Sequence, residues 1–115
     1  MSFLPGVDCA VVEEEKIVAY LLNAEHPQGK SKARFFLGHG ALAADWQSMR
    51  QVLLTHARSN PVAKVRTSPY GDLYQVDCSV ALPDGVAFCI RTVWEIRPEQ
   101  ACPRLVTAHP NELGE

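Results

Sequence analysis

The order of apolar and polar residues changes its period once, about halfway along the chain. Before that point, the run EEEKIVAYLLNAE repeats apolar residues every three or four positions. This spacing predicts an amphipathic helix over residues 13–24, whose first turn carries three glutamates that suit the positive end of a helix dipole. The apolar stripe of this helix consists of Ile17, Tyr20, Leu21 and Ala24.

A second stretch of helical period is ALAADWQSMRQVLLTHARSNP. It predicts a helix over residues 41–58, because the residue before a proline disfavours helical geometry and Pro61 follows closely. His56 lies beside the apolar stripe near the end of this helix, where we expect it to interact favourably with the helix dipole. The stripe consists of Leu42, Trp46, Met49, Leu53 and Ala57.

Beyond Pro61 apolar and polar residues alternate, and turn-forming sequences recur at SPYGD, LPDG and RPEQACP. Alternation with a period of two, interrupted by Gly, Pro and Asp, predicts β-strands joined by turns. Four strands are expected, over residues 62–67, 73–82, 86–96 and 103–108.

The alternation divides the predicted sheet into an apolar face and a mixed face. In the second strand the apolar face consists of Tyr74, Val76, Cys78, Val80 and Leu82. In the third strand the even-numbered residues from Val86 to Ile96 continue that face, and the odd-numbered ones form the mixed face. In the last strand the alternation separates Leu105, Thr107 and His109 from Val106 and Ala108.

Short connections between successive strands predict an antiparallel meander, since parallel neighbours require longer crossover segments. The predicted fold class is therefore α+β, with two N-terminal helices packed on a four-stranded antiparallel sheet in the order α-α-β-β-β-β. A length of 115 residues suits a single domain. We expect its core at about residues 13–110, followed by a short polar tail.

Charge and hydropathy narrow the classes of partner. A net charge of -2 and a pI of about 6.1 give no overall basic field, so an RNA partner would need a local cluster of cations. The N-terminal residues lack the basic start and apolar run of a signal peptide, and no segment approaches the roughly 20 apolar residues of a membrane span. We therefore expect a cytoplasmic protein without a membrane partner.

The four cysteines are spaced singly, at positions 9, 78, 89 and 102. Zinc and redox sites usually pair their cysteines a few residues apart, so this spacing predicts no metal, and no motif indicates another cofactor. Cys78 and Cys89 fall in apolar strands, where a thiol behaves as a small hydrophobic group. In a cytoplasmic chain we expect the cysteines to be reduced.

The densest group of cations is in HPQGKSKARFF, residues 26–36. A proline and a glycine interrupt the helix here, so we expect a connection between the two helices that is anchored to the core by its two phenylalanines. Cations held in this way can bind a phosphate, because ammonium and guanidinium groups supply both charge and hydrogen-bond donors. The alternative is a helix stop followed by solvated loop residues. The candidate residues are His26, Lys30, Lys32 and Arg34.

A second group of polar residues lies on the mixed face and in the last strand. Arg91 and Glu95 project from one face of the third strand, and a cross-strand or same-face ion pair is their simplest interpretation. Thr107 and His109 either reflect strand propensity and a strand end, or face a cleft shared with the basic stretch. His39, between two glycines, is expected in a loop. No Walker loop, dinucleotide glycine motif or Ser-His-Asp order is present, which removes several enzyme classes.

The segments KIVAYLLNAEHPQGKSKARFF, WQSMRQVLLTHA, TVWEI and RLVTAHP together resemble a known family. This is an uncharacterised family of small bacterial proteins and toxin-associated domains. Its pattern is a helix ending in YLL, then HPxGxxKAxFF, a helix with a tryptophan, and a last strand reading LVTAYP. The resemblance spans about residues 13–110, and its most specific part is HPxGxxKAxFF. His109 stands where many relatives have tyrosine.

The resemblance implies a fold similar to the barnase, RelE and colicin-type ribonucleases, and hence a metal-independent endoribonuclease in which the ribose 2'-hydroxyl attacks the adjacent phosphate. Fold alone does not fix function. On this hypothesis His26 acts as general base or acid, and Lys32 stabilises the negative charge on the phosphate oxygens. Thr107 donates a hydrogen bond to the phosphate, and His109 transfers a second proton. Further phosphate-binding residues are Lys30, Arg34 and Arg91.

Two other functions stay open. One is a non-catalytic binding or interaction protein of the same fold, which the mild acidity favours. The other is a toxin-neutralising partner, for which an exposed acidic or apolar surface is the expected sign. The expected partners are accordingly RNA or a cognate antitoxin or immunity protein. The nuclease hypothesis requires His26 and Lys32 to lie within about 10 Å of Thr107 and Arg91.

Overall fold

A four-stranded antiparallel sheet follows a helical N-terminal half in the computed structural model, which describes residues 2–25 and 30–111. The strand order is β1-β2-β3-β4, so each strand pairs with its neighbour in sequence. This confirms the predicted α+β class and the antiparallel meander. The strands are β1 (Val62–Ser68), β2 (Gly71–Ala81), β3 (Ala87–Ile96) and β4 (Arg104–Pro110).

The helical half contains three α-helices and short 3-10 and π segments. Helix α1 passes directly into the π-helical segment η2, and together they occupy the first predicted helix. The elements are η1 (Val7–Cys9), α1 (Glu14–Lys16), η2 (Ile17–Leu21), α2 (Lys30–Gly38), η3 (Ala43–Asp45) and α3 (Trp46–Ser59). Within the described ranges no helix is both long and apolar enough to span a membrane.

Helix α2 shows that the two-helix expectation is incomplete, because it occupies most of the stretch predicted as a connection. Its residues are mainly good helix formers, and no proline or glycine interrupts them before Gly38. Ala33 and Phe36, three positions apart, are fully buried and so form a short apolar stripe on one side of the helix. The basic residues of this stretch therefore project from a helix rather than from a loop.

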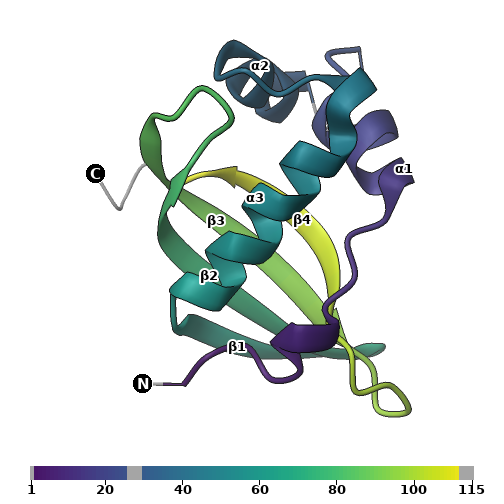
Figure 1. Ribbon diagram of the computed structural model, residues 1–115. Coiled ribbons are helices and arrows are strands. Elements are labelled where there is room, and N and C mark those ends of the chain that lie inside the picture. Colours follow the sequence, from purple (N-terminus) through teal and green to yellow (C-terminus); the bar gives the residue numbers. More distant parts are fainter. Residues whose placement is uncertain (1, 26–29, 112–115) are drawn as a thin grey trace.

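The helices are divided between a face and an edge of the sheet. Helix α3 lies across one face, and α1 and α2 lie together beside β4 (Figure 1). The core is formed between α3, η2, α2 and the inner face of the sheet. Its largest fully buried side chains include Trp94, Phe36, Ile17, Leu21, Met49 and Leu53.

His56 lies near the end of α3, as expected, but it is part of this core and its ring is bonded to β3. Its side chain is fully buried, and Nε2 lies 3.0 Å from the Ile90 carbonyl oxygen while Nδ1 lies 3.0 Å from Thr92 Oγ1. Trp94 Nε1 donates to the same threonine oxygen over 2.8 Å. One neutral arrangement satisfies every group: Trp94 donates to Thr92, Thr92 donates to His56, and His56 donates to Ile90.

A β-bulge in β4 changes which residues face the core. Leu105 pairs with Trp94, and Thr107 pairs with Val93. Val93 and Trp94 are adjacent on β3, whereas their partners on β4 have one extra residue, Val106, between them. The extra residue reverses the alternation after it. Thr107 and His109 therefore face away from the core, on the side opposite Leu105 and Ala108, whereas the simple alternation places them with Leu105. We call this outer side of the sheet the polar face.

The four cysteines form two disulfides, Cys9–Cys102 and Cys78–Cys89, so the expected free thiols are wrong. Cys78 leaves regular strand geometry, with φ of 111°, and is joined to Cys89 on the adjacent strand. Because disulfides persist mainly in oxidising surroundings, the cysteines give no support to the cytoplasmic location expected from the sequence.

The Cys9–Cys102 bond ties the N-terminal segment to the connection between β3 and β4. Val11 extends this attachment, since its amide donates to Pro103 and its carbonyl accepts from Leu105. Gly6 has φ of 70°, and a side chain at this position would collide with the carbonyl of Ala101. A glycine is therefore required for the segment to approach the connection so closely.

Candidate functional site

Three polar side chains meet where the helices lie against the edge strand β4. Lys32 Nζ donates to the Tyr20 hydroxyl over 2.6 Å and to Thr107 Oγ1 over 3.0 Å, and the two hydroxyl oxygens lie 3.4 Å apart. We call these residues the Lys32 cluster. A lysine, a phenol and an alcohol within hydrogen-bond distance offer several donors to one small anion.

Each member of the Lys32 cluster comes from a different element. Tyr20 belongs to η2, Lys32 to α2 and Thr107 to β4. Burial of Ala33 and Phe36 fixes the orientation of α2, and the bulge at Val106 turns Thr107 outward. All three side chains are half-buried, so the cluster is held in place and still reaches solvent.

Two cations lie near the Tyr20 ring. Lys16 Nζ lies 5.2 Å from the ring centroid and Lys32 Nζ lies 5.0 Å from it, both within the range of cation–π attraction. Burial raises the pKa of the Tyr20 phenol, but the hydrogen bonds from Lys32 and Thr107 and the charges of Lys32 and Lys16 outweigh it. The pKa of Tyr20 therefore lies below the ordinary value of a tyrosine.

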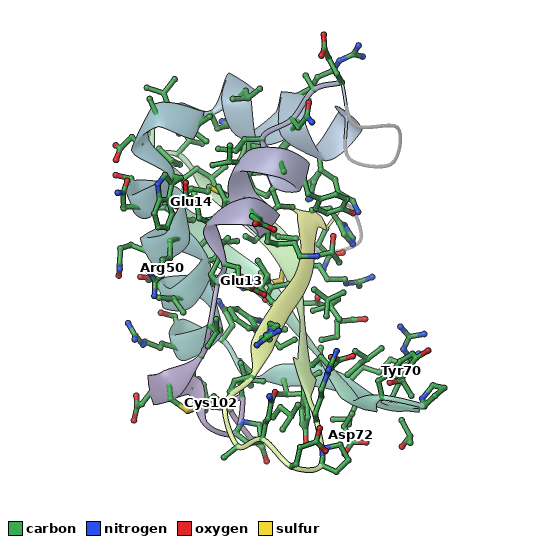
Figure 2. The ribbon with its side chains drawn as sticks, turned by 90° about the vertical axis from the view of Figure 1, so that its right-hand side faces the viewer. Glu13, Glu14, Arg50, Tyr70, Asp72 and Cys102 are labelled. Atoms are coloured by element: carbon green, nitrogen blue, oxygen red, sulfur yellow. A yellow bond between two sulfur atoms is a disulfide. The ribbon has the colours of Figure 1, made fainter. Side chains whose placement is uncertain are left out.

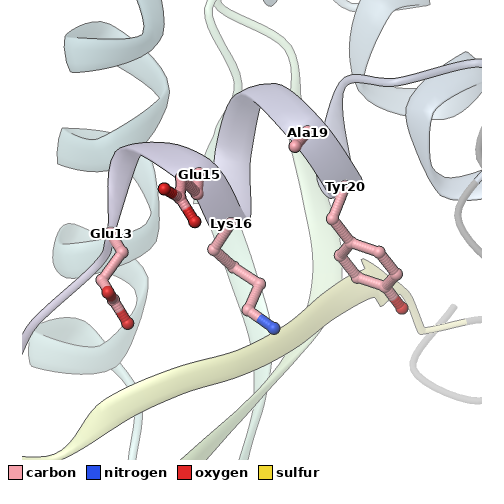
Figure 3. A pocket seen from close by; sticks show the side chains of 5 residues that line it. All are labelled: Glu13, Glu15, Lys16, Ala19 and Tyr20. Atoms are coloured by element: carbon pink, nitrogen blue, oxygen red, sulfur yellow. The ribbon is translucent and has the colours of Figure 1, made fainter.

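A cavity of about 400 Å³ opens beside the Tyr20 ring. It is lined by Glu13, Glu15, Lys16, Ala19 and Tyr20. Figure 3 shows Glu13, Lys16 and Tyr20 projecting from the helix toward β4. The two carboxylates and the Lys16–Tyr20 pair give the cavity one negative part and one positive part.

A second polar group lies on the polar face next to the Lys32 cluster. Arg91 pairs with Asp77 across the strands, with Nε 2.9 Å from Oδ1 and Nη2 3.3 Å from Oδ2. His109 is directly opposite Arg91 in the register, and its Nδ1 lies 3.0 Å from the Pro110 carbonyl oxygen. A neutral His109 that donates from Nδ1 keeps Nε2 as an acceptor. Thr107 is two residues away on the same strand, about 7 Å along it.

Of the two kinds of ion pair expected here, the structure shows the cross-strand one, between Arg91 and Asp77, and not a same-face pair of Arg91 with Glu95. Glu95 instead accepts from Arg97, whose Nε lies 2.9 Å from Oε1. Arg91 and Glu95 are four positions apart on β3 and share a face, but Asp77 is directly opposite Arg91 on β2. A partner directly across the ladder is nearer than one along the same strand.

The remaining predicted site residues are not all brought to the Lys32 cluster. Arg34 is exposed and, two positions from Lys32 on the same helix, lies on a different side of it. His39 Nδ1 lies 3.0 Å from Asp84 Oδ2, in a contact between the end of α2 and the β2–β3 turn. His26 and the side chain of Lys30 lie outside the described part of the structure.

Sequence reasoning missed Tyr20, Lys16 and Asp77. Tyr20 fits the apolar stripe of its helix, so the period assigns it to the core, and the structure instead places its hydroxyl on Lys32. The sequence does contain one sign that Tyr20 has a polar neighbour. Lys16 precedes it by four positions, and residues at this spacing meet on one side of a helix. Among the described residues, no group of three or more His, Cys, Asp or Glu side chains is arranged to hold a metal ion.

Residues 3–112 match a family described as a domain of unknown function, DUF6883. No curated protein matches the chain. Among solved structures, it is similar to a chain of a contact-dependent growth inhibition toxin–immunity protein complex from Klebsiella pneumoniae 342, with a TM-score of 0.66 and 16% identity. The match covers 93% of this chain and 97% of the other. At this identity the likeness concerns the fold.

Proposed function

The chain belongs to the DUF6883 family, and from this premise we propose that it is a toxin-like, metal-independent ribonuclease. The observation that carries the proposal is the position of Lys32, whose ammonium group is held by Tyr20 and Thr107 at the edge of the polar face. Cleavage by the ribose 2'-hydroxyl needs stabilisation of a phosphate that gains negative charge, and two groups that move protons.

Lys32 and Thr107 would bind the phosphate that is cleaved. A bound phosphate oxygen would replace one of the present acceptors of Lys32 Nζ, which lies 3.0 Å from Thr107 Oγ1. The ammonium group would then stabilise the charge that develops on the non-bridging oxygens, and the Thr107 hydroxyl would donate a second hydrogen bond. Arg91, held by Asp77, would add positive charge from the neighbouring strand.

His109 is the described histidine best placed to move a proton. Its Nε2 would accept the proton of the 2'-hydroxyl as the 2'-oxygen bonds to phosphorus. The bond to the 5'-oxygen then breaks, and this oxygen takes a proton from the Tyr20 hydroxyl. The proton held on His109 then returns to the Tyr20 oxygen through water, which restores both groups. His26 keeps its predicted role as an alternative base or acid. The products are a 2',3'-cyclic phosphate and a 5'-hydroxyl.

The likeness to a component of a toxin–immunity complex supports the toxin-like setting. That complex pairs a toxin with an immunity protein, and a chain of the same fold would accordingly have a cognate partner. RNA as the substrate rests on the Lys32 cluster and on the family resemblance of the HPxGxxKAxFF stretch.

The test is cleavage of RNA by the purified protein in the presence of EDTA. We expect products that end in a 2',3'-cyclic phosphate, and no cleavage by a Lys32→Gln protein purified identically, which also controls for contaminating nuclease. Arg58→Gln makes the same change of charge on an exposed residue of α3 and should keep full activity. Equal cleavage by the wild type and Lys32→Gln would overturn the proposal.

A toxin-neutralising partner is the second candidate, and one surface favours it. Glu13, Glu14 and Glu15 are exposed and line a second cavity of about 520 Å³ together with Val12, Trp46 and Arg50. Glu14 and Arg50 lie on the same side of the molecule (Figure 2), and Arg50 Nε is buried without a hydrogen-bond partner among the described residues. Such a surface suits a basic protein segment that also supplies an acceptor.

Growth of cells that express the chain separates the two candidates. A ribonuclease toxin should arrest growth, and Lys32→Gln should relieve the arrest. A neutralising partner should leave growth unaffected and should not depend on Lys32.

A further inference from the structure

The cavity next to the Lys32 cluster shares a wall with it. The Tyr20 ring lines the cavity, while the Tyr20 hydroxyl lies 2.6 Å from Lys32 Nζ. A phosphate held by Lys32 would therefore have its adjoining nucleoside beside or inside the cavity. A volume of about 400 Å³ lies within the range of small-molecule sites.

The charges in the cavity are ordered along the helix. At one end Lys16 lines the cavity, 5.2 Å from the centroid of the Tyr20 ring. Lys32, from α2 and outside the lining, lies 5.0 Å from the same centroid. At the other end are the carboxylates of Glu13 and Glu15. Glu13 also forms an ion pair with Arg104 at 3.6 Å. Of the two carboxylates, that of Glu15 therefore interacts less with a neighbouring cation. The cavity thus matches a ligand that carries an anion at one end and a hydrogen-bond donor at the other.

A nucleotide has this distribution of groups. Its phosphate is anionic, and adenine, cytosine and guanine carry exocyclic amino groups with two N–H donors for carboxylates, whereas uracil offers only a single ring N–H. A basic protein side chain would suit the glutamates but would be repelled by Lys16 and Lys32. Both ends of the cavity therefore favour a nucleotide over a cationic peptide.

From these observations we infer that the cavity is a subsite for the nucleoside adjoining the phosphate at Lys32. Glu15, assisted by Glu13, selects a base with an exocyclic amino group over uracil. This inference rests on the proposed RNA-cleaving function, and it adds a base preference that the Lys32 cluster alone does not supply.

The direct test is binding of AMP, CMP and UMP to the protein. Binding is monitored through the NMR shifts of the backbone amides of Lys16, Ala19 and Tyr20. We expect AMP and CMP to bind about fivefold more tightly than UMP, which corresponds to one partly exposed hydrogen bond to a charged group. Glu15→Ala should reduce the difference in affinity between UMP and the other two nucleotides to less than about twofold, because it removes the carboxylate that accepts from the amino group. It should not weaken the binding of UMP, because it also removes a negative charge.

Glu14→Ala is the matched control. Glu14 is adjacent in sequence and carries the same charge, but it lines the second cavity and not this one. It should keep the wild-type preference. Equal affinity of the wild type for the three nucleotides, a ratio unchanged by Glu15→Ala, or no shift at the three amides would overturn the inference.

Cleavage of oligo(A), oligo(C) and oligo(U) separates this inference from the function on which it rests. If no RNA is cleaved but AMP and CMP bind selectively through Glu15, the ribonuclease proposal fails and the cavity stands as a nucleotide site. If all three are cleaved equally, and Glu15→Ala changes nothing, the ribonuclease stands and the subsite fails.

Discussion

Two threonines on neighbouring strands occupy the centres of two polar groups on opposite faces of the sheet. Thr92 of β3 accepts from Trp94 over 2.8 Å and lies 3.0 Å from His56. Thr107 of β4 accepts from Lys32 over 3.0 Å. The hydroxyls are chemically alike and their hydrogen bonds are of similar length, but their surroundings differ.

The group around Thr92 is sealed and neutral. His56, Thr92 and Trp94 are fully buried, each donor has one acceptor, and burial lowers the pKa of His56 against the opposing effect of its bond to Ile90. The group around Thr107 is half-buried and contains the charge of Lys32. A sealed and satisfied group stabilises the fold, whereas a charged group with access to solvent can exchange its partners for a ligand.

The largest effect is expected from Thr92→Val. It leaves the indole N–H of Trp94 and the Nδ1 of His56 without their partner, and each buried unsatisfied group costs about 1–3 kcal/mol. We expect the free energy of unfolding, measured in urea, to fall by about 2–4 kcal/mol. The RNA cleavage of the folded variant should match the wild type. Unchanged stability would show that the buried group is not stabilising.

Thr107→Val makes the same substitution on the other face. Stability should change by less than about 1 kcal/mol, because Lys32 can be solvated. RNA cleavage should fall about 10- to 100-fold, as expected when one donor to a developing anion is removed. Thr107→Ser keeps the hydroxyl and should retain cleavage within about threefold. If both variants are equally active, the hydroxyl has no part in catalysis.

The smallest effect concerns pH. The folded-state pKa of His56 lies below its unfolded value, so the unfolded chain binds more protons once the pH falls below about 6.5. The stability contributed above that pH is therefore lost on acidification, by less than about 1.4 kcal/mol per pH unit for this one group. NMR titration of the His56 ring in the folded protein should give a pKa below the ordinary value of a histidine. Protonation of His56 with an ordinary pKa would contradict the assignment of a sealed neutral group.

The central strand β3 could be predicted because its alternation matches the core and solvent sides of the sheet. Strand β1, whose middle residues are exposed, was indicated mainly by the turn signals beside it. Helix α2 could not be predicted, because its buried stripe consists of only Ala33 and Phe36, and the proline and glycine before it suggest a loop. The cysteine pairs were also missed. Cys9 and Cys102 are 93 positions apart, and nothing in their spacing indicates that the N-terminal segment runs beside the β3–β4 connection.

The candidate site could be predicted only in part. Lys32 and Thr107 were candidates from the basic stretch and the last strand, and the family resemblance gave them roles. The structure brings them within 3.0 Å of each other, while their catalytic roles stay predictions. The orientation of Thr107 was missed because a count from Leu105 assumes regular alternation, whereas Val106 is an extra residue in the strand. Tyr20 was not proposed as a site residue, because the helical period places it in the apolar stripe that faces the core.

The Cys9–Cys102 bond makes most of the chain a covalent ring, closed over a separation of 93 residues. Tension applied to the two ends would pass through the sulfur atoms and would leave the ring unextended, even if the sheet inside it came apart. An unfolded ring cannot be threaded through a narrow pore in single file, because two lengths of chain must pass side by side. Reduction of this bond would open the large ring and leave only the short loop that Cys78–Cys89 closes.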